Sequence, residues 1–579
     1  MYSFRELQKA KKKQVEGKEN RLAVLGNCAT QFFSDAIEGF ARLSGINLVV
    51  YDADYNQIDA QLLDPSSEVY GFNPDEILIW LASEKVYEEF LREELDARKT
   101  FAERFIDKIE HYWDLVAKNS SARIIQMNFT EIDDKVLGQY SCKVESTFAY
   151  QIRKLNYLLQ EAALKNNKVF PVDLLSIQHD VGREKYFNAP LYYNAKMVIS
   201  MGVLPTVAEA VVGVIRAMEG KLKKCIILDL DNTLWGGVIG DDGLAGIEIG
   251  ELGKGHVFSD IQLWLRQLKE YGIILAVCSK NDENIAKEPF EHHDEMVLRL
   301  SDISVFVANW NDKASNIKLI QETLNIGMDS IIFLDDNPFE RNLVKEKLPA
   351  IEVPELPDDP SLWLSFLQHQ NYFDTVSYTG SGSDRTKLYQ AEYERKKSEQ
   401  SFESIDEYLE SLDMVGMAST FEPLQYPRIA QLTQRSNQFN LRTIRYTEDE
   451  IQRIAEDENY ITFYFSLKDK FGDHGLVSVL ILKRMSEYEV FVDTWLMSCR
   501  VLKRGMEEFV INNMVQTIKE KGITTITAEY IPTPKNAMVK DIYERMSFSR
   551  TAENRFQLDL SGYKELKTFI KENCKDGEK

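Results

Sequence analysis

The chain lacks the sequence features that mark secreted, membrane-spanning and metal-stapled proteins. It has only six cysteines in 579 residues, and none of them forms a CxxC pair, which argues against a disulfide framework or a zinc site and favours reduced thiols. Its longest apolar runs, such as residues 273–278, are far too short to cross a bilayer. Residues 1–6 lack the apolar segment of a secretory signal. We therefore expect a cytoplasmic protein with no membrane insertion.

Positively charged residues are also fewer than negatively charged ones. The chain has 69 lysines and arginines against 92 aspartates and glutamates, for a formal net charge of -23. This balance argues against nonspecific binding to nucleic acid or to an anionic membrane surface. The remaining composition, 44% hydrophobic and 28% charged, is ordinary for a soluble globular protein, and the length predicts three or four domains.

Residues 21–216 alternate short β-rich runs with amphipathic stretches. Ile152, Leu155 and Leu159, for example, are spaced to form one face of a helix. Alternating strands and helices predict a parallel sheet that is covered on both faces. The strands are expected at residues 22–25, 48–51, 77–81, 124–127 and 169–172.

Residues 220–372 repeat this alternation more cleanly. The expected strands are continuous apolar runs, which are typical of strands buried on both faces. Each run ends in a polar cluster, and ligands bind at the carboxyl ends of strands in open α/β sheets. These strands are expected at residues 225–230, 273–277, 305–308 and 331–334.

A turn-rich break and a charged stretch precede the last part of the chain. Residues 379–384 form the break, and residues 387–409 are expected to be helical. The last segment is expected to be a separate α/β or α+β domain with a helix at about 505–519. Its strands are expected near residues 461–465, 477–482, 490–495 and 524–528.

The strongest chemical signal is Asp229-Leu230-Asp231-Asn232-Thr233, at the end of the first strand of the second region. Two carboxylates two residues apart can face one ligand if the loop coils. Phosphoryl transfer uses such a pair: one carboxylate attacks phosphorus and becomes an aspartyl phosphate, and the other protonates the leaving oxygen and then activates water. A cation must offset the charge of the phosphate beside these carboxylates.

The other parts of such a site follow later strands in order. Ser279 and Asn281 supply a hydroxyl and an amide after the second strand. Lys313 follows the third strand at the start of an expected helix, where the helix N-terminus and the lysine both favour phosphate. Asp335 and Asp336 follow the fourth strand and offer the hard oxygen ligands that suit magnesium. Surface acids that merely cap strand ends are the alternative, and four motifs in order argue against it.

This set resembles the four motifs of the haloacid dehalogenase superfamily. The resemblance implies that Asp229 is the nucleophile, that Asp231 is the general acid and base, that Lys313 assists them, and that the cofactor is Mg2+. It also implies phosphate binding by Thr233, Ser279, Asn281 and Lys313, and metal binding by Asp229, the Asp231 carbonyl, Asp335 and Asp336.

The spacing of the first two motifs argues against a cap domain. Asp231 and Ser279 are 48 positions apart, and much of this segment is expected to be helical. Little sequence therefore remains for a domain that covers the site. We expect an open site, which suits a large substrate or one that a partner presents.

Further stretches narrow the resemblance to the FkbH-like branch of this superfamily. They lie at residues 234–240, 335–341, 434–440, 471–475 and 495–502, within a similarity that spans roughly residues 190–565. The branch is associated with converting 1,3-bisphosphoglycerate into a glyceryl thioester on an acyl carrier protein. Some longer members, with an extra N-terminal domain, go with surface-polysaccharide biosynthesis.

The last domain resembles the GNAT acyltransferase fold at a turn that follows a strand and opens a helix. Backbone N–H groups at such a turn bind the phosphate of a pantetheine arm. The resemblance implies pantetheine binding by Arg500, Lys503, Arg504 and Gly505. Lys503 stands where the GNAT pattern has its first glycine, and Lys503 and Arg504 can serve the single phosphate of a carrier-protein arm.

Cys499 is the residue for which the sequence gives the most specific hypothesis. It lies just past an expected strand and before Arg500 and a helix N-terminus, which both favour a thiolate. A thiolate can attack the acyl phosphate, hold glycerate as a thioester and pass it to pantetheine; the alternative is a small buried hydrophobe. His474 is either a base for this thiol or a structural histidine. Cys225 and Cys278 are expected in the core.

In the first domain, residues 25–30 (Leu-Gly-Asn-Cys-Ala-Thr) resemble the first block of the SGNH hydrolase fold, with Cys28 where those enzymes carry serine. Asn128 is a candidate oxyanion donor, and His179 is a candidate base that Asp173 or Asp180 orients. The spacing differs from the usual terminal Asp-x-x-His block. We therefore expect a degenerate, noncatalytic domain that binds substrate or partner.

The sequence thus predicts three α/β domains: an SGNH-like domain at residues 1–216, a haloacid dehalogenase core at 217–374 and a GNAT-like domain at 413–579, with a connector at 375–412. The favoured function is phosphoryl removal from a phosphorylated small molecule, coupled to glyceryl transfer onto an acyl carrier protein. The alternatives are a plain magnesium phosphatase for a sugar or lipid-linked phosphate in surface-polysaccharide biosynthesis, and a nonenzymatic scaffold.

Overall fold

The computed structural model describes residues 2–376 and 404–573, together with residues 389–391, 395, 398 and 402. The chain forms two compact units, Met1–Met218 and Glu219–Lys579, where the sequence predicted three domains. Most of the helix expected at 387–409 lies outside the described residues, and its end coincides with α19 (Ile405–Ser411). Among the described residues, no helix is both long enough and apolar enough to span a membrane.

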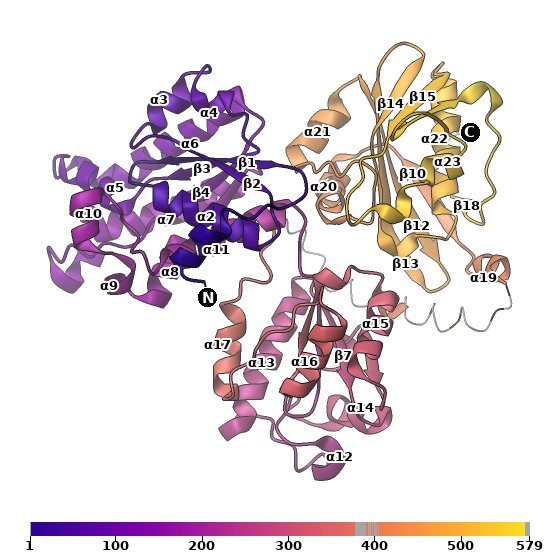
Figure 1. Cartoon of the computed structure of the whole chain (residues 1–579), viewed down its shortest axis with the longest axis horizontal. Helices are drawn as coiled ribbons and strands as arrows, with labels where there is room; N and C mark the ends of the chain where they lie inside the picture. The colour runs from indigo at the N-terminus through magenta and orange to yellow at the C-terminus, as the bar shows by residue number, and fades with distance from the viewer. Residues whose placement is uncertain are drawn as a thin grey trace. The chain divides into compact units, whose positions relative to one another are not determined.

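The first unit is built on a five-stranded parallel sheet. Its strands are β1 (Asn20–Gly26), β2 (Leu48–Asp52), β3 (Glu76–Trp80), β4 (Arg123–Met127) and β5 (Val169–Val172), in the order β2-β1-β3-β4-β5. The expected strands of this region are confirmed. Helices α2 (Gln31–Leu43), α6 (Phe101–Asn119), α7 (Phe148–Leu164) and α11 (Leu204–Met218) surround the sheet (Figure 1). Buried residues of the sheet, α6 and α7 form one continuous apolar core.

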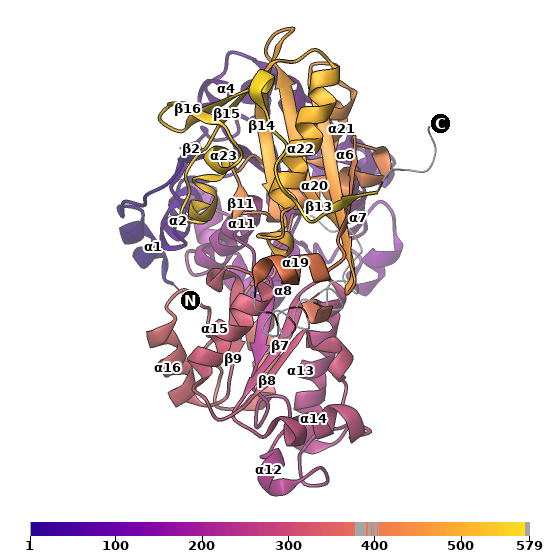
Figure 2. The ribbon, with the colours of Figure 1, turned by 90° about the vertical axis from the view of Figure 1, so that its right-hand side faces the viewer.

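The second unit begins with a four-stranded parallel sheet. Its strands are β6 (Cys225–Leu228), β7 (Ile274–Ser279), β8 (Val305–Ala308) and β9 (Ile331–Leu334), in the order β8-β7-β6-β9. Helices α13 (Gly253–Glu270) and α14 (Glu283–His292) lie on one side, and α15 (Lys313–Leu324) and α16 (Pro338–Lys347) on the other (Figure 2). The two faces of the sheet bury separate apolar clusters, which explains why the strands are apolar throughout.

The rest of the second unit contains a larger, mixed sheet. Strands β12 (Tyr460–Asp469), β13 (Gly472–Arg484) and β14 (Glu489–Met497) are antiparallel, and β15 (Thr525–Glu529) runs parallel to β14. Helix α22 (Met506–Glu520) packs its buried residues into the core beside them. The sheet also contains five short strands that the sequence did not predict: β10 (Val415–Ser419), β11 (Phe439–Asn440), β16 (Ser549–Ala552), β17 (Arg555–Asp559) and β18 (Lys571–Glu572).

Candidate functional site

The four predicted motifs meet at the carboxyl edge of the four-stranded sheet. Asp229 directly follows β6, Ser279 ends β7, and Asp335 directly follows β9. Lys313 is the first residue of α15, because Asp312 caps this helix by accepting a hydrogen bond from the Ser315 backbone N–H at 3.2 Å. A pocket of about 350 Å³ opens there. Its lining includes Asp229, Asp231, Ser279, Lys280, Lys313, Asp336 and Glu340.

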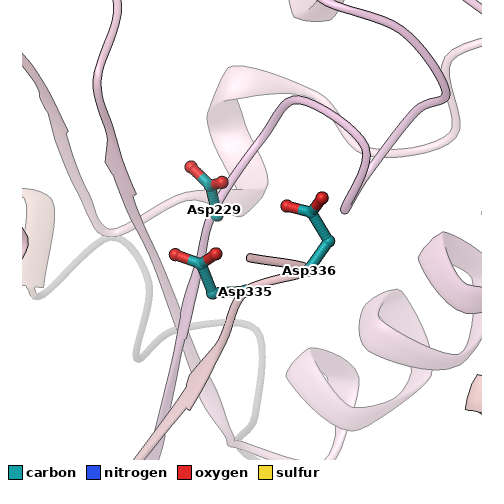
Figure 3. Close-up of side chains that lie close together, drawn as sticks. All are labelled: Asp229, Asp335 and Asp336. Atoms are coloured by element: carbon teal, nitrogen blue, oxygen red, sulfur yellow. The ribbon is translucent and has the colours of Figure 1, made fainter. Parts of the chain in front are cut away.

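Three carboxylates in this pocket region are arranged as a metal site. One oxygen from each of Asp229, Asp335 and Asp336 lies within 4.8 Å of the other two. Figure 3 shows the Asp229 and Asp335 carboxylates one above the other, with the Asp336 carboxylate beside them. Asp229 and Asp335 are buried. A compact set of hard oxygen ligands of this kind fits Mg2+.

Lys313 joins two of these carboxylates. Its ammonium Nζ lies 2.9 Å from Asp229 Oδ2 and 2.6 Å from Asp335 Oδ2, and its side chain is only 4% exposed. Burial raises the pKa of Asp229 to about 7, an effect that Lys313 opposes and the nearby Asp335 reinforces. Burial alone would lower the pKa of Lys313, but the two carboxylates raise it above its usual value. The lysine is therefore charged and neutralises part of a buried acidic cluster.

Asp231 belongs to a different network. Its Oδ1 accepts hydrogen bonds from the Trp235 indole Nε1 and the Ile239 backbone N–H, both at 3.0 Å, and its Oδ2 accepts one from Asn281 Nδ2 at 2.8 Å. Asn232 adopts a left-handed backbone (φ 53°), which coils the loop so that Asp229 and Asp231 line the same pocket. The carboxylate of Asp231 is not part of the metal-type cluster, in keeping with the backbone carbonyl role implied by the resemblance.

Two predicted phosphate-binding residues, Thr233 and Asn281, are not among the described residues that line the pocket. Thr233 Oγ1 accepts a hydrogen bond from the Asp336 backbone N–H at 3.1 Å and holds that loop in place. Asn281 Nδ2 contacts Ser279 Oγ at 3.3 Å in addition to Asp231. Ser279 and Lys313 do line the pocket. The sequence reasoning missed Lys280 and Glu340, although Lys280 directly follows Ser279 and Glu340 lies four positions after Asp336, in the first turn of α16.

No cap domain is present in residues 229–279, which are all described. The segment between β6 and α13 contains only the four-residue helix α12 (Ile239–Asp242). Its later part is held against the core by Ile247 and Ile249, which join the apolar cluster under α13. The residues in this segment are therefore anchored to the core rather than folded into a lid.

Cys499 lies in a second cavity, of about 340 Å³. The cavity is also lined by the stretch 435–439, so parts of two motifs that carried the family resemblance meet there. Its wall includes Ile274 and Ser330, at the amino ends of β7 and β9, whereas Asp229 lies at the carboxyl edge of the same sheet. The two pockets share no described lining residue. The charged residues of its lining are mostly cationic: one carboxylate, Asp329, pairs with Lys535, and the other cations are Lys224, Arg428, Arg435 and Arg500.

The predicted pantetheine turn has a left-handed backbone at two positions. Lys503 has φ 63° and Gly505 has φ 77°, so Lys503 adopts the conformation for which glycine is usually selected. Arg500 lines the Cys499 cavity. Arg504 is buried instead, with Nη1 3.5 Å from Asp469 Oδ2 and 3.4 Å from His474 Nε2.

His474 belongs to a buried ion cluster. Its Nε2 lies 3.1 Å from Asp469 Oδ2, and burial lowers its pKa. Asp469 also binds Arg395 through two hydrogen bonds of 2.7 Å. Although burial alone would raise the pKa of Asp469, the hydrogen bonds from His474 and Arg395 hold it well below its usual range. His474 is not among the described residues that line the Cys499 cavity.

The candidate residues of the first unit do not assemble into a hydrolase site. Cys28 is fully buried, and burial raises the pKa of its thiol well above the usual value. Asn128 Nδ2 donates to Asp173 Oδ1 at 2.7 Å, which uses the amide that was the candidate oxyanion donor. His179 is exposed on α8 (Leu174–Val181). Cys225 and Cys278 are core residues, as expected, and burial raises the pKa of both thiols.

Comparison with known proteins shows a clear similarity to a solved structure. The chain is similar to the N-terminal part of the protein BF1531 from Bacteroides fragilis, which contains a phosphatase domain and was crystallised in complex with Mg. The two share 44% sequence identity, the match covers 65% of this chain and 100% of that chain, and the TM-score is 0.63. The model of the FkbH N-terminal domain family matches residues 21–216. No curated protein matches the chain.

The similarity to the BF1531 structure shows the family to which the chain belongs. At 44% identity over the whole of the solved relative, the chain belongs to the family of BF1531, whose N-terminal part contains a phosphatase domain. The ribosomal-protein-S18-alanine N-acetyltransferase from Escherichia coli also matches, at 15% identity over 26% of this chain and 97% of that chain, with a TM-score of 0.20. So low a score establishes no activity for the last part of the chain.

Proposed function

We propose that the chain is a magnesium-dependent phosphohydrolase of the haloacid dehalogenase type. The observation that carries this proposal is the cluster of Asp229, Asp335 and Asp336, which Lys313 partly neutralises at the carboxyl edge of a parallel sheet. The phosphatase domain in the related BF1531 protein, crystallised with Mg, supports it. Mg2+, held by the same three carboxylates, would supply positive charge to the transferring phosphoryl group.

In this mechanism the Asp229 carboxylate attacks the phosphorus of a phosphate ester. The P–O bond to the leaving group breaks as the aspartyl phosphate forms, and Asp231 gives its proton to the departing oxygen. Asp231 then takes a proton from a water molecule that attacks the aspartyl phosphate, which releases inorganic phosphate and restores Asp229. Ser279 and Lys313 donate hydrogen bonds to the phosphoryl oxygens, and the Trp235 and Asn281 contacts keep Asp231 in position.

The test is Mg2+-dependent hydrolysis of p-nitrophenyl phosphate by the full chain. Asp229→Asn should lower kcat by at least about 1,000-fold, because no covalent intermediate can form. Asp241→Asn changes an exposed aspartate of the adjacent helix α12 and serves as the matched control. An inactive wild type on every phosphate ester tried would favour the scaffold alternative.

We further infer that dephosphorylation is coupled to acyl transfer through Cys499. The Cys499 thiolate would attack the acyl carbon of 1,3-bisphosphoglycerate, which forms a thioester and releases the acyl phosphate as inorganic phosphate, and the Asp229 site would hydrolyse the remaining phosphate ester. The thiol of a carrier-protein pantetheine would then displace Cys499. The mostly cationic lining of the Cys499 cavity supports an anionic acyl donor there. Arg500, Lys503 and Gly505 are proposed for the pantetheine phosphate, and Arg504, which is buried against Asp469, is proposed to position the turn.

A plain phosphatase acting on a sugar or lipid-linked phosphate is the second candidate. It is favoured by the separation of the two pockets, because phosphoryl transfer at Asp229 needs nothing from Cys499. Intact-mass spectrometry distinguishes the two, after the protein is mixed with Mg2+, 1,3-bisphosphoglycerate and a pantetheinylated carrier protein. A glyceryl adduct on the carrier supports coupled transfer. Phosphate release without any adduct supports the plain phosphatase.

We also propose that the first unit is a noncatalytic module of the SGNH type that binds substrate or partner. The burial of Cys28 and the exposure of His179 support this reading. Thioesterase activity that survives Asp229→Asn and is abolished by Cys28→Ala would contradict it.

A further inference from the structure

The mouth of the Asp229 pocket holds an ion pair that the proposed chemistry does not use. Lys280 Nζ lies 2.5 Å from Glu340 Oε1, and both residues line the pocket. Lys280 directly follows the last residue of β7, and Glu340 lies in the first turn of α16. The pair therefore connects the loops after two strands that are separated by β6 in the sheet.

Lys280 is the more accessible of two cations in the pocket. Among the described residues that line it, Lys280 and Lys313 carry positive charge. Lys313 is only 4% exposed and is bound to Asp229 and Asp335, whereas the side chain of Lys280 is 36% exposed. An ammonium group has three donors, and Glu340 accepts one of them. Lys280 thus keeps two hydrogen-bond donors that Glu340 does not use, on the lining of the pocket.

Glu340 holds Lys280 in this place. The Glu340 side chain is only 8% exposed, and its Oε2 has no hydrogen-bond partner among the described residues. A buried carboxylate with one free oxygen strongly favours a nearby cation. The lysine is therefore anchored beside the phosphoryl site rather than free to turn into solvent, which reduces the entropy lost when it binds a ligand.

We propose that Lys280 is a specificity-determining residue, which binds a second anionic group of the substrate next to the phosphoryl group. The preferred substrates are then phosphate esters or anhydrides that carry a carboxylate or a second phosphate a few bonds from the reacting phosphorus. A phosphate ester with a neutral remainder gains only the contacts of the phosphoryl group itself. This inference rests on the proposed phosphohydrolase function and names the substrate class of that site.

The test uses two ligands that differ in one group. 3-Phosphoglycerate carries a carboxylate where glycerol 3-phosphate carries a hydroxymethyl group. Each is measured as a competitive inhibitor of Mg2+-dependent p-nitrophenyl phosphate hydrolysis, so that neither has to be turned over. The ratio of the two inhibition constants cancels any general change in the pocket. We expect the wild type to bind 3-phosphoglycerate about tenfold more tightly, as one charge-assisted contact provides.

Lys280→Met should bring this ratio to within about twofold of one, and Lys280→Arg should retain most of it, because the arginine keeps the charge. A wild-type ratio near one, or a Lys280→Met ratio equal to that of the wild type, overturns the proposal. If Lys280→Met lacks turnover, calorimetric titration of the Mg2+-loaded variant with the same two ligands gives the ratio. Absence of p-nitrophenyl phosphate hydrolysis by the wild type is instead a failure of the proposed function.

Discussion

The indole Nε1 of Trp235 donates a 3.0 Å hydrogen bond to Oδ1 of Asp231, the proposed general acid and base. Trp235 is fully buried and packs against Phe290 with ring centroids 5.9 Å apart. Its rigid position therefore fixes the orientation of the carboxylate. This contact also gives a chemical role to Trp235, which follows the first motif of the site.

Trp235→Phe removes this donor and keeps most of the apolar ring. We expect kcat to fall about tenfold, and more for alkyl phosphates than for p-nitrophenyl phosphate, because a poor leaving group depends more on the general acid. The measurement is kcat for both substrates in the wild type and the variant. Trp264→Phe, a change away from the pocket in α13, is the control, and an equal loss for both substrates would argue against a role in acid catalysis.

Lys313→Met leaves the buried carboxylates of Asp229 and Asp335 without their cation. We expect kcat to fall at least about 100-fold, because the phosphoryl group loses a charged donor. We also expect thermal unfolding at lower temperature, more so in EDTA than in Mg2+, since a bound cation replaces the lost charge. Lys318→Met, an exposed position on the same helix, should change neither quantity. A loss of stability that is the same in EDTA and in Mg2+ would contradict the charge argument.

The affinity for Mg2+ should increase with pH. Burial raises the pKa of Asp229 to about 7, and a carboxylate must lose its proton to bind a metal. Below this pKa the proton competes with Mg2+, so the apparent affinity should rise about tenfold between pH 6 and pH 8. Calorimetric titration at several pH values checks this. The increase should be much smaller in Asp229→Asn, and a pH-independent affinity in the wild type would show that Asp229 is already ionised at pH 6.

Cys499→Ala should abolish any covalent glyceryl adduct on the chain and leave Mg2+-dependent phosphatase activity within about twofold. The reason is that the Cys499 cavity and the Asp229 pocket share no described lining residue. Intact-mass spectrometry and p-nitrophenyl phosphate hydrolysis measure the two effects. Cys142→Ala, at an exposed thiol, is the control. An adduct that persists in Cys499→Ala would place the acyl group on another residue.

Asp469→Asn should destabilise the chain, because it leaves the buried Arg395 guanidinium without its carboxylate partner. We expect a loss of about 3 kcal/mol or more in the free energy of unfolding at pH 7. The pKa of Asp469 is depressed in the folded state, so its stabilising effect is present above the unfolded pKa of about 4 and is lost as pH falls further.

Urea denaturation of wild type and variant at pH 7 and at pH 3 to 4 measures this difference. The difference in the free energy of unfolding between wild type and Asp469→Asn should be smaller at the lower pH. Asp473→Asn, at an exposed aspartate in the same hairpin, is the matched control. If this difference in the free energy of unfolding becomes larger toward low pH, Asp469 is protonated in the folded state.

The sequence predicted the two parallel sheets well, because their strands are apolar runs buried on both faces. The same runs located the site: Asp229, Ser279 and Asp335 each lie at or just beyond the end of such a run, and the carboxyl ends of parallel strands meet at one edge. The short strands of the large sheet left no such signal. β18, for example, has only two residues and pairs with β10, about 155 positions earlier in the chain, so only the tertiary fold creates it.

Side-chain direction accounts for the remaining differences at the site. Thr233 and Asn281 have the residue types of phosphate ligands, but the folded loops turn them toward Asp336 and Asp231. Lys280 and Glu340 come from separate loops, and only the packing of α16 beside the sheet brings them together.

The sequence alone therefore determined the strands of the two parallel sheets, which edge of the four-stranded sheet carries the chemistry, and which residue types are present there. The tertiary structure decided which of those side chains face the pocket, and it placed Cys499 at the amino edge of the sheet that carries Asp229 at its carboxyl edge. The physical reason is that a local run of apolar residues is enough to indicate a strand buried on both faces. The contacts of a polar side chain depend instead on groups that are distant in sequence and meet only in the folded chain.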